Sequence, residues 1–267
     1  MKIVRGKKAL VTGAASGIGR AIALALAREG ADLFLVDLDE LNLQTVADEG
    51  RHFGSKVIIA ACDLSRADQI TTTVQACEAA FQGLDILVNC AGIVRHGVAE
   101  QATSETWDAV MAVNLFAAVQ LVRELSPLLM KQPESHILNV CSVLGLIPAR
   151  KMMCYQTSKF ALVGFSLALR TEFCAHNIGV TALCPGLVDT PMFEMGPSWF
   201  RKSVSLGPIS LVISADTVAK SAIASIRGNR AIVVVSLGAK LIWWIYRLSP
   251  ALVLWLFRRK PIARAHR

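Results

Sequence analysis

Short runs of consecutive apolar residues alternate along the chain with longer segments in which apolar side chains recur at helical spacing. The short runs are rich in Val, Ile and Leu, and their length is typical of buried strands. Near-continuous apolar strands separated by helices indicate a parallel sheet with both faces covered. We predict strands at residues 9–12, 33–36, 57–60, 85–89, 136–140, 179–183 and 231–235, and helices at 17–29, 104–131, 155–175 and 215–227, with a polar helix before the third strand.

The same alternation predicts how the chain is organised. No linker, repeat or low-complexity segment interrupts it before residue 237. We therefore predict an α/β protein with a doubly wound parallel sheet, in one domain over residues 1–236. Residues 237–267 form a C-terminal extension that is apolar first and basic at its end.

This C-terminal extension contains the apolar run Leu241–Phe257, with three of the five tryptophans of the chain. A helix that spans a membrane needs about 20 apolar residues. The run has 17, and Arg247 and Pro250 interrupt it, so we do not expect it to span. Two short amphipathic helices on a membrane surface, with the basic residues 258–260 outside, agree better with the pattern. Alternatively, the extension packs on a neighbouring subunit or over a pocket of the main domain.

Composition and charge limit the kinds of partner that the chain can bind. Hydrophobic residues make up 54% and charged residues 18% of the 267 residues, as in a globular protein with a large core. The net charge is +8, and the last ten residues contribute five of these charges without an acid. A basic tail favours an anionic surface. Its aromatic residues have aliphatic neighbours, which argues against nucleic acid as the partner.

The cysteines and the N-terminus bear on metal binding and location. Seven cysteines are scattered singly, and neither a CxxC pair nor a Cys/His cluster occurs, so we expect no metal site. Such spacing is typical of reduced thiols. Residues 1–8 lack the apolar stretch of a secretory signal. We therefore predict a cytoplasmic protein that contacts a membrane surface through its extension.

A glycine-rich turn lies between the first predicted strand and the first predicted helix. Glycine lets the backbone turn tightly and approach a ligand without a Cβ clash. The free N–H groups and the positive dipole end of the following helix suit a pyrophosphate. The candidate ligands in this turn are Gly13, Ser16, Gly17, Ile18 and Gly19.

Asp37 ends the second predicted strand, 24 residues after Gly13. A carboxylate at this place can accept hydrogen bonds from the ribose hydroxyls of an adenosine. It would repel a 2′-phosphate, and neither Ser16 nor Leu38 is a basic residue that would offset this repulsion. The sequence therefore predicts NAD rather than NADP.

Tyr155 and Lys159 stand four residues apart at the start of a predicted helix. Side chains at this spacing share one helix face and can touch. Free tyrosine titrates at about 10, and a neighbouring ammonium favours its ionised form. The pair is a candidate proton donor and acceptor near neutral pH, although a surface Tyr–Lys pair has the same spacing.

These features belong to a longer series of motifs in a fixed order. The series is Thr12-Gly13-x-x-x-Gly17-x-Gly19, Asp63-Leu64, Asn89-Cys90-Ala91-Gly92, Asn114, Ser142, Tyr155-x-x-x-Lys159 and Pro185-Gly186-x-Val188-x-Thr190. It resembles the classical short-chain dehydrogenase/reductase family over about residues 6–236. The resemblance implies a Rossmann-type fold and a homodimer or homotetramer built through the long helices that carry Asn114 and Tyr155. Cys90 departs from the family, which usually has Asn there, and we expect little functional effect.

The resemblance also implies roles for these residues. The catalytic set would be Asn114, Ser142, Tyr155 and Lys159. Tyr155 would exchange the proton, Lys159 would also donate to the nicotinamide ribose, and Ser142 would donate to the substrate oxygen. Asn114 would hold a water that links Lys159 to solvent. At the cofactor, Asp63 and Leu64 would flank the adenine, Asn89, Ala91 and Gly92 would pass the adenosine ribose, and Pro185, Gly186, Val188 and Thr190 would hold the nicotinamide end.

Apolar residues gather around the expected substrate side. They are Val143, Leu144, Ile147, Met152 and Met153 near the catalytic set, and Met192, Phe193, Met195, Trp199 and Phe200 in the segment 191–214. Such a list predicts an apolar pocket with few polar anchors, suited to a lipophilic alcohol or ketone such as a steroid, retinoid or long-chain lipid. An alternative is a non-catalytic NAD-binding regulator or scaffold on the same fold, although a binding module has no need of the acid/base pair.

Overall fold

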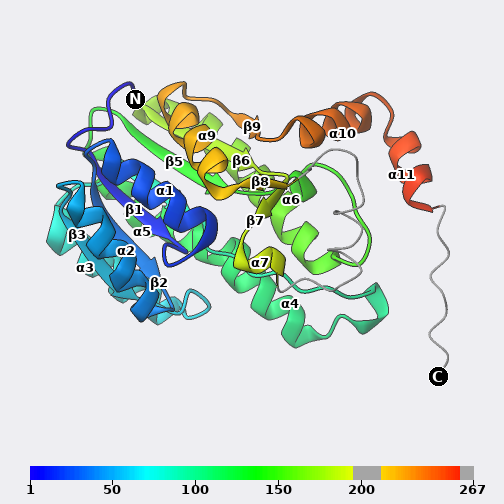
Figure 1. Ribbon diagram of the computed structural model, residues 1–267, viewed down its shortest axis with the longest axis horizontal. Helices are drawn as coiled ribbons and strands as arrows, with labels where there is room; N and C mark the ends of the chain where they lie inside the picture. Colours follow the sequence, from blue (N-terminus) through cyan, green and yellow to red (C-terminus); the bar gives the residue numbers. More distant parts are fainter. Residues whose placement is uncertain (195–211, 259–267) are drawn as a thin grey trace.

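The computed structural model describes residues 1–194 and 212–258, and they form a parallel sheet with helices on both faces (Figure 1). The seven strands have the order β3-β2-β1-β4-β5-β6-β9, and every neighbouring pair is parallel. Their bounds are β1 Lys8–Thr12, β2 Asp32–Asp37, β3 Val57–Ala61, β4 Ile86–Asn89, β5 Ser135–Val140, β6 Ile178–Cys184 and β9 Ile232–Val234. The predicted doubly wound α/β fold is therefore confirmed.

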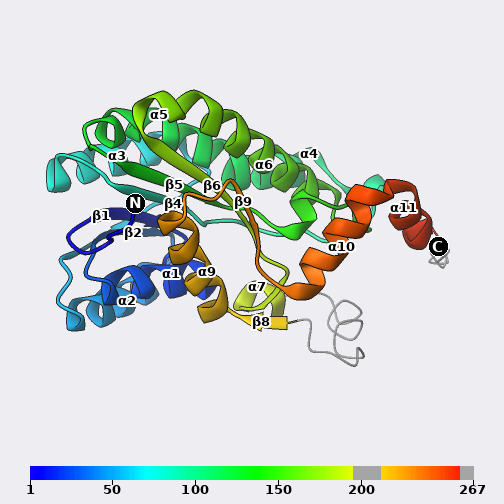
Figure 2. The same ribbon diagram turned by 90° about the horizontal axis from the view of Figure 1, so that it is seen from above.

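Two layers of helices cover the sheet, and Figure 2 shows one layer on each side of it. One layer contains α1 Gly17–Arg28, α2 Glu40–His52 and α9 Ala215–Arg227, and the other contains α3 Ala67–Phe81, α5 Ala117–Met130 and α6 Met153–Phe173. Ile22 and Leu26 of α1 are fully buried against one face of the sheet, and Leu121 and Leu125 of α5 are buried on the other. The central strands are accordingly apolar for most of their length, because both faces of the sheet are covered, and polar side chains of β5 such as His136 and Asn139 are buried as well.

The helix predicted at residues 104–131 is not a regular α-helix. It consists of α4 Ser104–Met111, a π-helical segment Ala112–Phe116 and α5. Such π segments insert one extra residue into a helix and often occur at functional sites. Among the described residues, Ser104–Met130 is also the helical stretch that is long and apolar enough to cross a membrane. Here its apolar side covers the sheet, as in the core helix of a globular protein.

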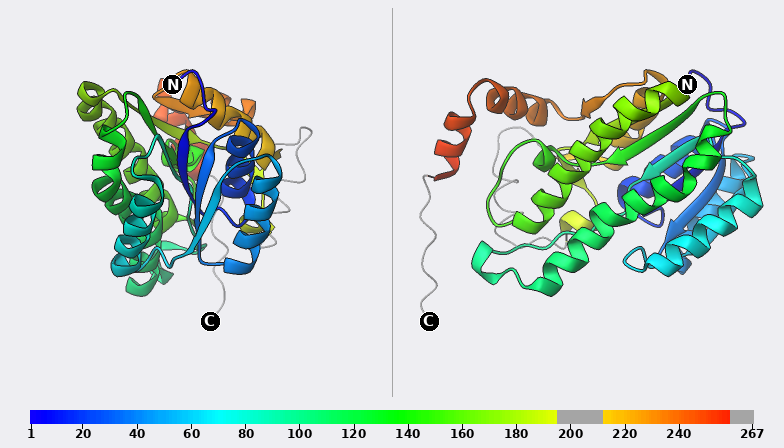
Figure 3. Two further views of the ribbon diagram at one scale, coloured as in Figure 1. Left: turned by 90° about the vertical axis from the view of Figure 1, so that its left-hand side faces the viewer. Right: turned by 180° about the vertical axis from the view of Figure 1, so that it is seen from behind.

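Smaller elements surround the carboxyl ends of the central strands. A second sheet pairs β7 Leu187–Asp189 with β8 Val212–Ser214, and α7 Pro191–Glu194 follows β7. After β9 the chain forms α10 Leu237–Leu248 and α11 Pro250–Arg258, which extend beyond the layered body (Figures 1 and 3). The extension thus forms the two short helices predicted for it, and neither is long enough to span a membrane.

Candidate functional site

The glycine-rich turn brings the ends of β1 and β4 into close contact. Gly13 has φ +66°, and a Cβ there would lie 2.8 Å from Cα of Ala91. At Gly19 a Cβ would overlap the carbonyl oxygen of Gly13. The Thr12 hydroxyl oxygen accepts hydrogen bonds from the N–H groups of Cys90 at 3.0 Å and Ala91 at 3.2 Å, which fixes the two strand ends together. Neither glycine can therefore be replaced without moving the backbone.

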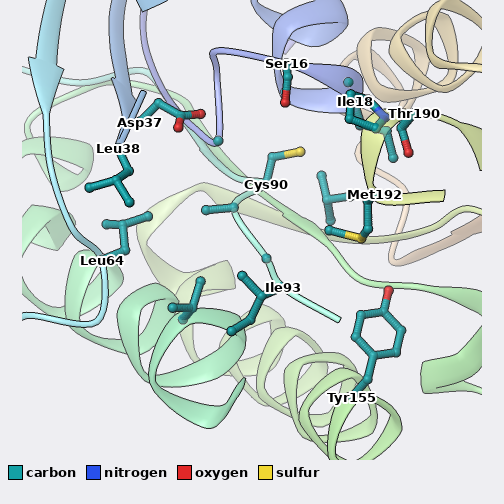
Figure 4. Close-up of a pocket in the computed structure, with 18 of the residues that line it drawn as sticks. Ser16, Ile18, Asp37, Leu38, Leu64, Cys90, Ile93, Tyr155, Thr190 and Met192 are labelled. Atoms are coloured by element: carbon teal, nitrogen blue, oxygen red, sulfur yellow. The ribbon is translucent and has the colours of Figure 1, made fainter. Parts of the chain in front are cut away.

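A cavity of about 310 Å³ opens above this turn. The N-terminus of α1 faces it, and the Ser16 hydroxyl, at the N-cap, makes no capping hydrogen bond among the described residues. The first N–H groups of the helix therefore stay available to an anion. Figure 4 shows Asp37 and Leu38 at one end of this cavity and Tyr155 at the other. The shape and the polar end groups fit a dinucleotide laid along the strand ends.

Asp37 is held in place at the end of β2. One carboxylate oxygen accepts a hydrogen bond from the N–H of Ala15 at 2.9 Å, and the other accepts from the N–H of Asp39 at 3.1 Å. Asp63 also lines the cavity, and hydrogen bonds from the side chain and the N–H of Ser65 hold the pKa of its carboxyl below the usual range. Two carboxylates thus face the end of the cavity predicted to receive an adenosine.

Tyr155 and Lys159 lie buried on one face of α6, as their spacing predicts. Their exposed fractions are 9% and 4%. The Lys159 ammonium donates a hydrogen bond to the carbonyl of Val140 at 2.9 Å and lies 5.8 Å from the centre of the Tyr155 ring. Lysine side chains are seldom buried this deeply unless they have a partner or a function. The two residues are therefore not a solvated surface pair.

Ser142 follows β5 and begins a short 3-10 helix, Val143–Gly145. Its hydroxyl oxygen accepts a hydrogen bond from the N–H of Leu144 at 3.1 Å. Since the hydroxyl hydrogen is not used in that bond, it can be donated to a ligand oxygen. Val143 donates its N–H to the carbonyl of Pro185 at 2.8 Å, which ties this turn to the end of β6.

Asn114 lies in the π-helical segment and supports the loop after β4. Its carbonyl oxygen accepts from the N–H of Ile93 at 2.7 Å, and its amide group donates to the carbonyl of Ile93 at 2.9 Å and to the Ser158 hydroxyl at 3.0 Å. A Cβ added at Gly92 would meet both the Asn114 oxygen at 3.3 Å and the Lys159 nitrogen at 3.5 Å. Asn114 and Lys159 therefore meet at the same glycine.

A family model described as short chain dehydrogenase matches residues 7–199. The chain belongs to the short-chain dehydrogenase family. It is 34% identical to 3-oxoacyl-[acyl-carrier-protein] reductase of Thermotoga maritima over 200 residues, which cover 75% of this chain and 81% of that protein. It is 35% identical to D-beta-hydroxybutyrate dehydrogenase of Cupriavidus necator over 195 residues, with coverage of 72% and 74%.

Solved structures agree with this assignment. A short-chain dehydrogenase from Burkholderia phymatum in complex with NAD has a TM-score of 0.84, 26% identity and full coverage of both chains. A short chain dehydrogenase from Burkholderia cenocepacia in complex with NADP has a TM-score of 0.82 and 30% identity, with 89% of this chain and 99% of that chain covered. The fold and the oxidoreductase class are therefore established, and the fit of the glycine cradle to a dinucleotide agrees with them.

A second cavity of about 450 Å³ adjoins the first, and Tyr155 lines both. It is mainly apolar, and Ser142 and His96 are among its polar residues. Burial lowers the pKa of His96, so the imidazole is neutral at pH 7. The predicted apolar residues Val143, Leu144, Ile147, Met152 and Met192 line this cavity, together with Ser236, Gly238, Ala239 and Ile242 at the start of α10.

The predicted site residues divide between the two cavities. The first is lined by Gly13, Ser16, Gly17, Ile18, Gly19, Asp37, Asp63, Leu64, Ala91, Gly92, Tyr155, Lys159 and Thr190, and the second by Ile18, Ser142, Tyr155, Pro185, Gly186, Val188 and Thr190.

Asn114 and Asn89 line neither cavity. The Asn89 amide donates to Asn139 at 2.8 Å in the core beneath the site. Met153 is 38% exposed and also lines neither. Met195, Trp199 and Phe200 lie outside the described residues, as does the side chain of Phe193.

Some lining residues were not predicted from the sequence. Cys90 stands in the motif 89–92, although no role was assigned to it; it lines the first cavity, and burial raises the pKa of its thiol to about 12, so it stays uncharged there. Leu38 and Cys141 also line this cavity. Outside a motif, a single apolar or thiol side chain gives no signal that distinguishes a cavity wall from core. The three lining residues of α10, Gly238, Ala239 and Ile242, agree with the alternative that the extension packs over a pocket.

Proposed function

We propose that this short-chain dehydrogenase interconverts a secondary alcohol and a ketone, or an aldehyde, on a lipophilic substrate, with NAD as its cofactor. The observation that carries this proposal is the position of Tyr155, which lines both cavities. One cavity has the glycine cradle and carboxylates that suit a dinucleotide, and the other is mainly apolar. A phenol between them can reach a substrate oxygen beside the cofactor.

The nicotinamide cofactor, when bound, would supply or accept the hydride. Residues of the chain would transfer the proton. Tyr155 gives a proton to the substrate oxygen in reduction and removes it in oxidation. The Lys159 ammonium lies 5.8 Å from the centre of the Tyr155 ring, and we propose that it also donates a hydrogen bond to the nicotinamide ribose. The Ser142 hydroxyl donates to the same substrate oxygen, where negative charge develops. Asn114 fixes the main chain of Ile93 beside Lys159, and the water relay through it stays a prediction.

NAD is proposed over NADP because of Asp37. Its carboxylate is fixed by two backbone N–H groups at the cavity end, and the neighbouring Leu38 offers no positive charge. The structural relatives include one complex with NAD and one with NADP, so the family alone does not decide the cofactor. A fixed carboxylate favours ribose hydroxyls and disfavours a 2′-phosphate.

The second cavity supports the lipophilic substrate. Its side chains can bury a hydrocarbon body, while Ser142 and Tyr155 bind one oxygen. A sugar would leave its other hydroxyl groups without partners on such walls. Steroids, retinoids and long-chain secondary alcohols are the substrate classes we propose, and the names of the relatives add 3-oxoacyl compounds and D-beta-hydroxybutyrate to those worth testing.

We also propose a homodimer or homotetramer in the cytoplasm, with the C-terminal extension at a membrane surface. Phe116 and Phe160, near the start of α5 and on α6, are 58% and 41% exposed. Such aromatic rings are typical of a subunit interface. The extension ends in basic residues, which suit an anionic membrane.

A substrate panel tests the proposed function. The purified chain is given steroids, retinoids, long-chain secondary alcohols and a 3-hydroxyacyl thioester, each with NAD and with NADP, and reduced nicotinamide is followed by absorbance. We expect turnover of at least one lipophilic alcohol, faster with NAD. Tight NAD binding without turnover of any compound would favour the non-catalytic regulator or scaffold.

A further inference from the structure

Helix α10 has two faces with different neighbours. One face carries Gly238, Ala239 and Ile242, which line the apolar cavity beside Tyr155. Ser236, at the N-cap, lines it as well and accepts a hydrogen bond from the N–H of Ala239 at 3.1 Å. The start of the helix is therefore capped and forms part of the wall of the proposed substrate cavity.

The opposite face of α10 is apolar and exposed. Leu237, Leu241, Trp244 and Leu248 recur at spacings of four, three and four residues, which places them in one stripe along a helix. They are 84%, 64%, 53% and 82% exposed. We call these four residues the apolar stripe. At 100° per residue the stripe points away from Ala239 and Ile242, so one helix separates the cavity from the outside.

The charges around the apolar stripe indicate which kind of surface the stripe binds. Lys240 and Arg247 lie seven residues apart on one flank of α10, and both are exposed. The Arg247 guanidinium lies 5.2 Å from the ring centre of Trp243 and 5.4 Å from that of Trp244. Residues 237–267 contain seven Lys and Arg and no Asp or Glu. Tryptophan and arginine beside an apolar face, with no acid, is the pattern of a helix that lies in the interface of an anionic bilayer.

A second copy of the chain is a less suitable occupant. The same stripe on the partner would bring the flanking cations of both copies together, and this segment has no acid to pair with them. Figure 2 shows α10 and α11 beyond the edge of both helical layers, where a flat surface could reach them. An anionic bilayer offers both the apolar depth and the negative charge.

We propose that the apolar stripe binds an anionic bilayer, and that α10 thereby holds this wall of the substrate cavity against the membrane, so that a lipophilic substrate enters from the bilayer rather than from water. This inference rests on the proposed function. It adds the source of the substrate, and it makes turnover of a membrane-dissolved alcohol depend on residues that do not touch the cavity.

A double variant of the apolar stripe tests this inference. Leu241→Glu/Trp244→Glu places two charges on the stripe and changes no residue that lines a cavity. Leu41→Glu on α2 is the matched control, because Leu41 is 85% exposed and lies outside both cavities. Flotation uses vesicles of phosphatidylcholine with and without 30% phosphatidylglycerol. We expect the native chain and Leu41→Glu to float with the anionic vesicles. The vesicle-bound fraction of the double variant should be at least tenfold smaller than that of the native chain.

Turnover separates delivery from catalysis. With NAD, 2-hexadecanol dissolved in anionic vesicles is compared with 2-butanol in water. We expect the double variant to lose at least tenfold in rate on 2-hexadecanol and to stay within twofold on 2-butanol. If the double variant floats as well as the native chain, the stripe does not bind the bilayer. If the double variant loses the same rate on both alcohols, the stripe only supports the fold.

Two further outcomes distinguish a failure of the proposed function from a failure of the membrane inference. If the native chain oxidises neither alcohol and no compound of the panel, the proposed function and the delivery fail, whereas flotation still decides the membrane face. If light scattering without vesicles shows that the double variant breaks a native oligomer, and both proteins float alike, the stripe is a subunit contact and the inference is wrong.

Discussion

Neutralising Asp37 should weaken the preference for NAD over NADP without loosening the site. In Asp37→Asn the remaining oxygen can keep the hydrogen bond from the buried Ala15 N–H, while the exposed Asp39 N–H turns to water. The turn should therefore stay in place. Only the negative charge and one of its acceptor atoms are lost.

The magnitude follows from the charge alone. Two unit charges about 5 Å apart repel by about 0.8 kcal/mol in bulk water and by about 3.3 kcal/mol at an effective dielectric constant of 20. The half-buried carboxylate lies between these limits, so its repulsion of a 2′-phosphate is worth about 1–3 kcal/mol. At 1.4 kcal/mol for each factor of ten, the ratio of the two dissociation constants should change by about 5- to 150-fold.

Isothermal titration calorimetry measures this ratio without a substrate. The Kd of NAD and of NADP is determined for the native chain, for Asp37→Asn and for Asp39→Asn. Asp39 is a suitable control because it lies two residues away, caps α2 and bonds Asn42. We expect Asp37→Asn to shift the ratio toward NADP and Asp39→Asn to leave it unchanged. Equal shifts in both variants, or none in either, would refute the assignment of cofactor choice to the Asp37 carboxylate.

Two further predictions concern the cradle and the core. Gly19→Ala should weaken NAD binding at least 100-fold, because its Cβ overlaps the Gly13 carbonyl, whereas Gly164→Ala on α6, where a Cβ meets nothing within 4 Å, should leave the Kd unchanged. Burial lowers the pKa of His136 to about 3, while an unfolded histidine titrates at about 6.5. The unfolded chain therefore binds a proton first as the pH falls. Its free energy of unfolding should drop by up to about 1.4 kcal/mol per pH unit from this residue between about pH 6.5 and 3. Urea titrations at pH 7, 6 and 5 should show this slope, and His136→Gln should remove it; an unchanged slope would contradict the assignment.

Much of the fold follows from local pattern. The predicted strands agree with the structure to within one or two residues, because most of them are apolar runs in a sheet that helices cover on both faces. The interruption of the helix at 104–131 could not be seen in this way. Asn114 bonds the main chain of Ile93, 21 residues earlier, and the π-helical segment surrounds that long-range contact.

The site was predictable to the extent that its residues lie in motifs. Glycines, Asp37 and the Tyr155–Lys159 pair occur at spacings that backbone geometry and chemistry require. The inner face of α10 was not predictable, because Ala239 and Ile242 resemble any apolar helix residues. Their role depends on the turn after Ser142, which the fold brings to them from about 100 residues away.

The most direct test of the central claim is Tyr155→Phe, which removes one hydroxyl and leaves the ring that packs beside Lys159. On any alcohol that the native chain oxidises, we expect kcat to fall by about 10²–10⁴-fold, as for loss of a general acid or base. The Kd for NAD, measured by calorimetry, should stay within about threefold of the native value. A variant that keeps more than a tenth of the native kcat would contradict the assignment of the proton transfer to Tyr155.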